Sequence, residues 1–411
     1  MSLFHETTEG LLGTHVIWDD IQEDCFKVFG PTAKLGQNKS IQDIADGKGS
    51  ISRIGVVIDP WEDPSLAENN GCPRKFVVKM GTALQQEKYN KKHMDEDQFA
   101  EMVKHVVRIH NVECQLYEKL RDVRDLPLLK VYASHPFSQE RPISGYLIME
   151  YVEHLINMTN KVYLNQQLVY QILTALAKYH SCSRLFSEEE KKPLTTGIVK
   201  DLFGTMLTDS YIDTSLSNCT KFLGEEKKDV VEQLRKSVAI VATEENRKKM
   251  DNMAEIIGMK RVLCHGDTWT CNLLCTNHPT PNKLHSLIDL QVSHFGCVGH
   301  DLARLFANVL NYESRQEKAG HYIDYYYENL VKEWPKDEEL PFSKEQVIKS
   351  YQAYLPLATY VVAVSSAALE VTGCEQTDKP EQTRQVIQKK RLTLWQQLLA
   401  TQSYHEEVND E

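Results

Sequence analysis

Two short runs in the second half of the chain bring together residue types that could carry phosphoryl transfer. The run VLCHGDTWTCN at residues 262–272 contains Asp267 five residues before Asn272, and the run LIDLQ at 287–291 contains Asp289. Transfer of a phosphoryl group from ATP to a hydroxyl needs a carboxylate that orients or deprotonates the attacking oxygen, and metal ligands that hold the phosphates. Oxygen ligands of this kind suit Mg²⁺. We therefore expect a catalytic Asp267, with Asn272 and Asp289 as metal ligands.

His265 precedes the Gly-Asp pair and is a second catalytic candidate. A histidine can move protons near neutral pH, but it can also support a loop through hydrogen bonds, and we favour the supporting role. Cys264, Cys271 and Cys275 lie nearby, but their spacing differs from that of the familiar zinc sites. We therefore expect no zinc here and interpret these cysteines as small core residues.

These motifs resemble those of the protein-kinase-like phosphotransferases that act on small molecules, such as aminoglycoside phosphotransferases and choline kinases. The order H-G-D-x-W-x-x-N, I-D-x-Q and then GCVGHDLARL at 296–305 is most similar to the ecdysteroid-kinase-like, choline-kinase-like family. The resemblance implies ATP and Mg²⁺ as cofactors and a bilobal, kinase-like α+β fold. It also implies that Asp301 is a structural anchor for the catalytic loop.

The resemblance extends to the first half of the chain. The run GKGSISRI at 47–54 is similar to the nucleotide loop of the family, with backbone N–H groups of Gly49, Ser50 and Ile51 available to phosphate. A plain hairpin turn would show the same pattern. Lys79, at the end of the apolar run KFVVKM, matches the phosphate-binding lysine, and Glu113 matches the helix glutamate that pairs with it.

The segment 149–152 is similar to the kinase hinge. The resemblance implies that backbone groups around Met149 and Tyr151 contact the adenine. The nucleotide site would then be built mainly from the N-terminal half of the chain.

The elements that must position these residues follow from hydrophobic periodicity. Strand-like texture covers 41–78, and a helix with one apolar face is expected at 99–120. Further strands are expected at 128–133 and 145–152, and an apolar helix at 168–180. The remainder is mainly helical, with strand-like pieces at 261–264 and 285–290. We therefore expect an N-terminal nucleotide-binding lobe at 1–152 with a mixed sheet and a helix, and a larger helical lobe at 153–411 that binds the acceptor.

Departures from protein kinases indicate a small acceptor. Two residues after Asp267, where protein kinases carry lysine, the chain has Trp269, and Asp289 and Asp301 are only 12 residues apart, which is too few for a long activation loop. The expected reaction is transfer of the γ-phosphate of ATP to a hydroxyl of a steroid, a glycoside or an amino alcohol. The alternative is a catalytically silent, kinase-like protein that binds a small ligand or regulates a partner; it would be marked by loss of Lys79, Asp267 or Asp289, and all three are present.

The sequence is compatible with each of these classes of acceptor. The tyrosine-rich run at 321–330 could supply an aromatic cage for an ammonium group, or it could be a helix with tyrosines in the core. The apolar run at 354–369 could line a sterol pocket, and with 16 residues it is better suited to a buried helix than to a membrane span.

The amino-acid composition limits the kinds of partner that the protein is expected to bind. The chain has 411 residues, of which 41% are hydrophobic and 26% charged, and its formal net charge is −11. It can therefore build a sizeable core, and its acidity disfavours binding to nucleic acid or to an anionic membrane. The N-terminus lacks the pattern of a signal peptide, and ten cysteines are too few for a disulfide scaffold. We expect a cytoplasmic protein with reduced thiols; protein partners cannot be assigned from the sequence.

Overall fold

The computed structural model describes residues 5–44, 51–69, 71–89, 95–157, 163–195, 197, 199, 204–223, 228–276 and 283–375, and six isolated positions beyond them: 381, 385, 389, 392, 393 and 396. The chain divides into two compact units, Met1–His154 and Leu155–Glu411. The division expected from the sequence lies after residue 152. Each unit is described by itself.

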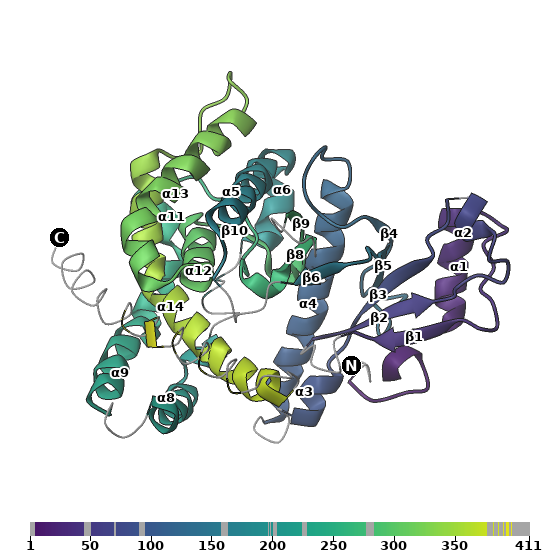
Figure 1. Ribbon diagram of the computed structural model, residues 1–411, viewed down its shortest axis with the longest axis horizontal. Coiled ribbons are helices and arrows are strands. Elements are labelled where there is room, and N and C mark those ends of the chain that lie inside the picture. Colours follow the sequence, from purple (N-terminus) through teal and green to yellow (C-terminus); the bar gives the residue numbers. More distant parts are fainter. Residues whose placement is uncertain are drawn as a thin grey trace. The chain divides into compact units, whose positions relative to one another are not determined.

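A five-stranded sheet with the order β1-β2-β3-β5-β4 forms the centre of the first unit, and every neighbouring pair is antiparallel. The strands are β1 (Ser40–Asp43), β2 (Ser52–Ile58), β3 (Lys75–Gly81), β4 (Val131–His135) and β5 (Tyr146–Glu150). The helices are η1 (Leu11–Gly13), α1 (Trp18–Phe29), α2 (Leu66–Asn69), α3 (Leu84–Tyr89) and α4 (Glu96–Leu120). Figure 1 shows the sheet between α1 and α4.

Alternation along β3 divides its side chains between the two faces of the sheet. Phe76, Val78 and Met80 share one core cluster with Ile21 and Cys25 of α1. The side chains between them point to the other face, where Lys79 meets α4. The 25-residue α4 begins three residues before the expected start of that helix, because Asp95 and Gln98 form a capping box at its N-terminus.

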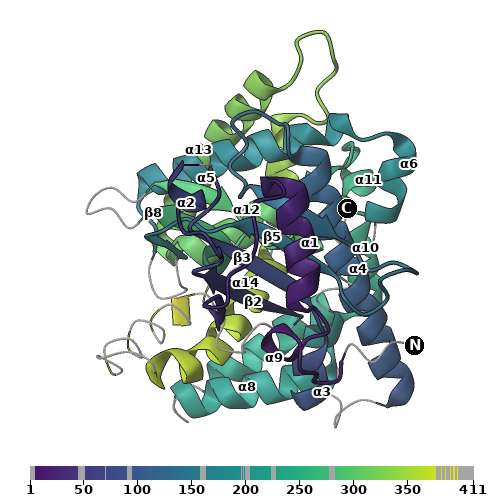
Figure 2. The same ribbon diagram turned by 90° about the vertical axis from the view of Figure 1, so that its right-hand side faces the viewer.

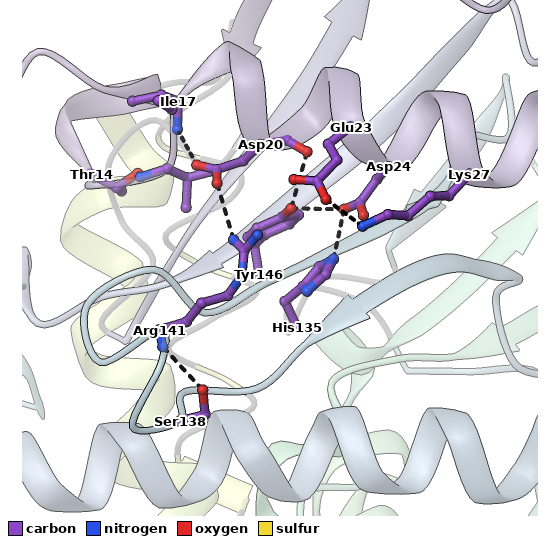
Figure 3. Close-up of polar contacts among 11 residues, drawn as sticks. Thr14, Ile17, Asp20, Glu23, Asp24, Lys27, His135, Ser138, Arg141 and Tyr146 are labelled. Atoms are coloured by element: carbon purple, nitrogen blue, oxygen red, sulfur yellow. Dashed lines mark hydrogen bonds and ion pairs between the residues drawn. The ribbon is translucent and has the colours of Figure 1, made fainter. Parts of the chain in front are cut away.

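A buried polar network fastens α1 to the sheet (Figure 3). The Tyr146 hydroxyl and His135 Nε2 both lie 2.7 Å from Asp24 Oδ2. One turn earlier on the helix, Arg141 Nη1 donates to Asp20 Oδ1 at 3.0 Å. Figure 2 shows α1 in front of the strands that it covers. The helix is thus held by polar contacts to β4, β5 and their connection as well as by apolar packing.

Helices dominate the second unit. They are α5 (Gln166–Ser181), η3 (Cys182–Leu185), α6 (Glu188–Lys191), η4 (Lys192–Leu194), η5 (Gly204–Leu207), α8 (Asp209–Leu223), α9 (Lys228–Ala242), α10 (Glu244–Asp251), α11 (Met253–Ile257), η7 (Thr270–Asn272), η8 (Leu290–Val292), α12 (Gly299–Val309), α13 (Tyr312–Glu333) and α14 (Lys344–Glu375). Helices α5 and α13 lie side by side (Figures 1 and 2), and His180 Nδ1 of α5 lies 2.7 Å from the Tyr326 hydroxyl of α13. The apolar run from residue 354 lies in α14, and its side chains are buried as far as Val362, beyond which those of α14 are not described.

Two small antiparallel sheets carry the loops of the candidate site. One pairs β7 (Val262–Cys264) with β10 (His294–Gly296), and the other has the order β6-β8-β9 with β6 (Leu155–Asn157), β8 (Leu273–Thr276) and β9 (Leu284–Leu287). The strand expected at 285–290 is therefore shorter, and its last residues enter the turn of η8.

The fold class expected from the sequence is confirmed: an α+β chain in two units, with a sheet and a long helix first and a mainly helical part second. The expectation of a mixed sheet is wrong, because every neighbouring pair of its five strands is antiparallel. Across the described part of the chain, no helix combines the length and apolar character that crossing a membrane requires.

Candidate active site

A tight turn after β7 presents Asp267. Gly266 precedes it with φ of +85°, and a Cβ at that position would lie 2.4 Å from the carbonyl oxygen of Val292. Both facts require glycine. The amide of Trp269 then donates to the Asp267 carbonyl at 2.9 Å, and that of Asn272 to the Trp269 carbonyl at 3.0 Å. The chain therefore folds back on itself between Asp267 and Asn272.

Asp301, in the first turn of α12, holds the start of this turn. Its carboxylate accepts the backbone N–H of His265 at 2.7 Å and that of Gly266 at 2.8 Å, and its Oδ2 lies 2.9 Å from His180 Nε2. Burial alone would raise the pKa of this carboxyl, but the hydrogen bond and charge of His180 outweigh burial and hold the pKa well below its usual range. The contacts are those of the anchor that the resemblance implied.

His265 uses both ring nitrogens within the loop. Its Nδ1 lies 3.3 Å from the backbone nitrogen of Asp267, and its Nε2 lies 3.1 Å from the carbonyl oxygen of Ile288. The neutral tautomer with a proton on Nε2 satisfies both contacts. This geometry favours the supporting role over proton transfer.

Asp289 is placed by the same pair of loops. The Ile288 amide donates to the Asn272 carbonyl at 3.1 Å, and Asp289 follows with φ of +69°. A non-glycine residue in this left-handed region is strained and persists only where surrounding contacts hold it. These contacts bring the Asp289 segment to the segment that carries Asn272.

The carboxylate of Asp267 has a different neighbour at each oxygen. Asn272 Nδ2 donates to Oδ2 at 2.9 Å, and Arg304 Nη2 donates to Oδ1 at 3.1 Å. Burial raises the pKa of Asp267; the charge of Arg304 opposes this and that of Asp289 adds to it, and the net result is a raised pKa. Its side chain is still 22% exposed, so a substrate can reach it.

Arg304 was missed by sequence reasoning. The available signal was its position three residues after Asp301 in the run DLARL, which places both side chains on one face of a helix. Within the second unit the structure thus brings together Asp267, His265, Asn272 and Asp289, and it adds Arg304 to them.

The donor set suits a magnesium ion. Asn272 turns its amide nitrogen toward Asp267, which leaves its side-chain oxygen as the atom for a cation. Asp289 supplies a carboxylate from the adjoining loop. Oxygen ligands from one amide and one carboxylate, completed by water and phosphate, are typical of Mg²⁺ at nucleotide sites.

The first unit contains the other candidate residues. Lys79 Nζ lies 2.6 Å from Glu113 Oε2, and the two side chains are only 7% and 1% exposed. The Ile51 carbonyl accepts the Thr82 amide at 3.2 Å, while Gly49 and Ser50 lie outside the described residues. Met149 is paired on both sides within the sheet, and Tyr151 follows the end of β5. Tyr151 is therefore the better placed of the two for a backbone contact with adenine, which stays a prediction.

The tyrosine-rich run forms part of α13. Tyr322 and Tyr326 are buried, and Tyr325 and His321 pack against Tyr170 of α5. Tyr322 and Tyr326 are therefore core residues of a helix, as in the second interpretation of this run, and not part of an exposed aromatic cage.

Comparison with known proteins gives a match over nearly the whole chain. The model of the family DUF1679, which is described as "Uncharacterized oxidoreductase dhs-27", matches residues 4–406. A Caenorhabditis elegans protein with the same description is 21% identical over 315 residues, which are 74% of this chain and 36% of that protein. The chain thus spans little more than a third of the length of this curated relative.

Solved structures with a similar arrangement include small-molecule kinases. The Plasmodium vivax ethanolamine kinase is 17% identical, with a TM-score of 0.43 over 87% of this chain and 82% of that chain. The choline kinase from Cryptosporidium parvum Iowa II is 10% identical, with a TM-score of 0.49 over 95% and 96%. The ADP-bound aminoglycoside phosphotransferase APH(2'')-Ib is 16% identical, with a TM-score of 0.41 over 93% and 99%.

Proposed function

The chain belongs to the ecdysteroid-kinase-like family DUF1679, and we propose that it is an ATP- and Mg²⁺-dependent phosphotransferase that phosphorylates a hydroxyl of a small molecule. The observation that carries this proposal is the environment of Asp267. A reachable carboxylate lies between the amide of Asn272 and the guanidinium of Arg304, on a turn whose first two amides are held by Asp301. A general base must lie within hydrogen-bond reach of the proton that it abstracts, and this carboxylate is both held in place and partly exposed.

In the proposed reaction, Asp267 orients the acceptor hydroxyl and accepts its proton. The new bond joins the acceptor oxygen to the γ-phosphorus, while the bond from that phosphorus to the bridging oxygen of ADP breaks. The raised pKa of Asp267 makes it a better proton acceptor than an exposed aspartate. Asn272 and Asp289 would hold the magnesium ion, which supplies positive charge to the phosphates.

Lys79 clamps the α- and β-phosphates in this proposal. Glu113 limits where the lysine ammonium can lie, because the two groups form a close buried ion pair. Backbone groups of Gly49, Ser50 and Ile51 contact phosphate, and those around Met149 and Tyr151 contact adenine. The acceptors to be considered are steroids, glycosides and amino alcohols.

The test is phosphate transfer by the purified protein from labelled ATP to a library of these three classes. Asp267→Asn should lower kcat by ~10²–10⁴-fold, or about 3–5 kcal/mol of barrier, and Asp289→Asn should also lower kcat because it weakens a proposed metal ligand. The exposed Asp337 offers a matched control, and Asp337→Asn should behave as wild type. Turnover within twofold of wild type in both site variants would refute the assigned roles.

The competing function is a catalytically silent protein that binds a small ligand. Ligands that bind only the folded state raise its apparent stability by mass action. Thermal unfolding with Mg-ATP and with each candidate acceptor therefore separates the two functions. Stabilisation by an acceptor alone, with none from Mg-ATP, favours the silent protein.

A further inference from the structure

Arg304 is a buried cation with unused hydrogen-bonding capacity beside the proposed base. The residue is 3% exposed, and its Nη2 donates to Asp267. Its Nε and Nη1 are buried and have no hydrogen-bond partner in the described structure. The guanidinium lies over the ring of Trp269, with 5.3 Å from Cζ to the ring centroid, and the indole Nε1 is likewise buried without a partner in the described part of the chain.

Unpaired buried donors are unusual and call for an explanation. Leaving a buried N–H without an acceptor costs free energy, and the cost is larger when the donor carries charge. Here three such nitrogen donors belong to two side chains in contact, one of which also contacts Asp267. A bound group that offers several acceptor oxygens would remove this cost, and a carboxylate, sulfate or phosphate ester matches the planar fork of arginine.

The position of Arg304 indicates which substrate carries that group. Asn272, the proposed metal ligand, contacts Oδ2 of Asp267, whereas Arg304 contacts Oδ1. Arg304 therefore lies at the carboxylate oxygen that does not face the metal ligand. If Asn272 marks the nucleotide side of the base, as in the proposed function, then Arg304 lies toward the acceptor side.

The same geometry disfavours a cationic acceptor. An ammonium group next to Arg304 would be repelled by a guanidinium that is shielded from water. One face of the Trp269 ring, which could otherwise attract an ammonium by a cation–π contact, already faces Arg304. Amino alcohols thus fit this position less well than acceptors with negative charge.

We propose that Arg304 and Trp269 form an acceptor subsite for an oxyanion, so that the acceptor carries a carboxylate, sulfate or phosphate ester near the hydroxyl that is phosphorylated. This rests on the proposed function, because it deepens the acceptor half of the same site. The subsite would also compensate for the replacement of the kinase lysine by Trp269. Arg304 of α12 would supply the positive charge that the lysine supplies in protein kinases, but on the acceptor side of the base.

The experiment uses three glycosides of one scaffold. The p-nitrophenyl β-D-glucuronide carries a carboxylate, the glucoside is neutral, and the 2-amino-2-deoxyglucoside carries an ammonium. Binding to the full chain is measured by calorimetry without nucleotide, and phosphate transfer is measured with labelled Mg-ATP. We expect the glucuronide to bind roughly 10- to 100-fold more tightly than the glucoside, as is usual for a charge-assisted pair, and the amino sugar to bind most weakly.

Variants at the subsite should remove this preference. Arg304→Met keeps the length of the side chain without its charge and should reduce the ratio of glucuronide to glucoside affinity to about one. Arg304→Lys should retain part of the ratio. Trp269→Phe removes only the indole N–H and part of the ring, and it keeps the test available if Arg304→Met does not fold. Arg184→Met, at an exposed arginine of the same unit, should keep the full ratio.

The outcomes separate this inference from the proposed function. Equal binding of the glucuronide and the glucoside, or a preference that Arg304→Met leaves intact, overturns the oxyanion subsite. Transfer of label to the neutral or amino sugar with no preference overturns it as well, while phosphotransfer itself stands. An Arg304-dependent preference in binding, with no label transferred to these glycosides or to any member of the library of three acceptor classes, supports the subsite and overturns phosphotransfer.

Discussion

At the scale of single residues, buried charges in this protein act through their specific partners. Asp267 and Arg304 form an ion pair in a setting where burial raises the pKa of the aspartate. Lys79 and Glu113 do the same in the first unit, where both are almost fully enclosed. A buried ion pair of this kind contributes little net stability compared with an apolar pair, but removing one partner leaves a buried charge unpaired.

Removing the charge of Lys79 should therefore destabilise the protein more than removing the pair. Lys79→Met should lower the free energy of unfolding by about 3–5 kcal/mol, because Glu113 stays buried without a counter-ion. The double variant Lys79→Met/Glu113→Leu should recover most of this loss. Unfolding in urea measures both, and ATP affinity should remain low in both because the phosphate-binding cation is gone.

Lys75 offers the control on the same strand. Its ion pair with Glu153 is exposed, with side chains 36% and 59% accessible, and such pairs are typically worth about 0–1 kcal/mol. The free energy of unfolding of Lys75→Met should therefore be close to that of the wild type. A double variant that is less stable than Lys79→Met alone would contradict the argument from unpaired charge.

At the scale of elements, helix α12 positions the candidate site. Asp301 holds the amides of His265 and Gly266, Arg304 contacts Asp267, and the side chain of Asn308 accepts the Thr270 amide at 2.9 Å. These three residues of α12 are spaced three and four apart, so they share one face of the helix. One helix face thus fixes the turn at three successive points.

Replacing Asp301 by asparagine should loosen this turn. The variant loses the charge that strengthens two backbone hydrogen bonds and the contact with His180, and hydrogen bonds to charged groups are worth about 1.5–3 kcal/mol each. We expect Asp301→Asn to lower the free energy of unfolding by about 2–4 kcal/mol, and to lower kcat as well. Asp324→Asn, which affects an exposed pair with Lys344, is the matched control. Wild-type stability in Asp301→Asn would show that α12 does not anchor the loop in this way.

The attachment of α1 should depend on pH through Asp24. Burial raises the pKa of this carboxyl, but hydrogen bonds from His135 and Tyr146 lower it further than burial raises it, so the folded-state pKa lies below the unfolded one. The unfolded chain therefore binds the proton more readily, and the stabilisation is present above about pH 4. It is lost as the pH falls through the folded-state pKa.

This dependence can be measured by urea unfolding of wild type and Asp24→Asn between pH 7 and pH 3. The difference in unfolding free energy should be about 2–4 kcal/mol near neutral pH and should shrink below about pH 4. Asp20→Asn, at the more exposed contact with Arg141, should cost less. A difference that is constant over the whole range would contradict the role of the Asp24 charge.

At the scale of the whole molecule, the formal charge of −11 opposes a highly anionic substrate such as ATP. Local positive charge must compensate, and in the proposed function it comes from Mg²⁺ at Asn272 and Asp289 and from Lys79. The net charge therefore predicts association with large anionic surfaces better than it predicts which ligand binds at one site.

Nucleotide binding should accordingly require the metal. Mg-ATP at 100 times its Kd should stabilise the protein by about 2.7 kcal/mol, whereas ATP with excess EDTA should give little stabilisation. Thermal unfolding with and without Mg²⁺ measures the difference, with Asp289→Asn expected to weaken the effect of the metal. Equal stabilisation with and without Mg²⁺ would contradict the assigned ligands.

Sequence periodicity predicted several of the elements, and the motifs predicted residues of which the structure brings Asp267, His265 and Asn272 together. The helix at α4 and the strands β3 and β5 follow local patterns of burial and spacing, whereas the pairing of Lys79 with Glu113 was implied by the family resemblance; the structure contains all of them. The ends of an element differ from the expected ones where a capping residue sets them, as Asp95 does at the start of α4.

Tertiary structure alone decided which side chains meet across long stretches of sequence. The contact of Arg304 with Asp267 joins residues 37 positions apart, and the network of Asp24, His135 and Tyr146 joins α1 to strands more than 100 residues later. The residues of a motif are close in sequence, so their types and spacing can be identified from the sequence alone. The residue that shifts the pKa of each buried charged group lies in a distant segment, and only the packing of the folded chain brings the two together.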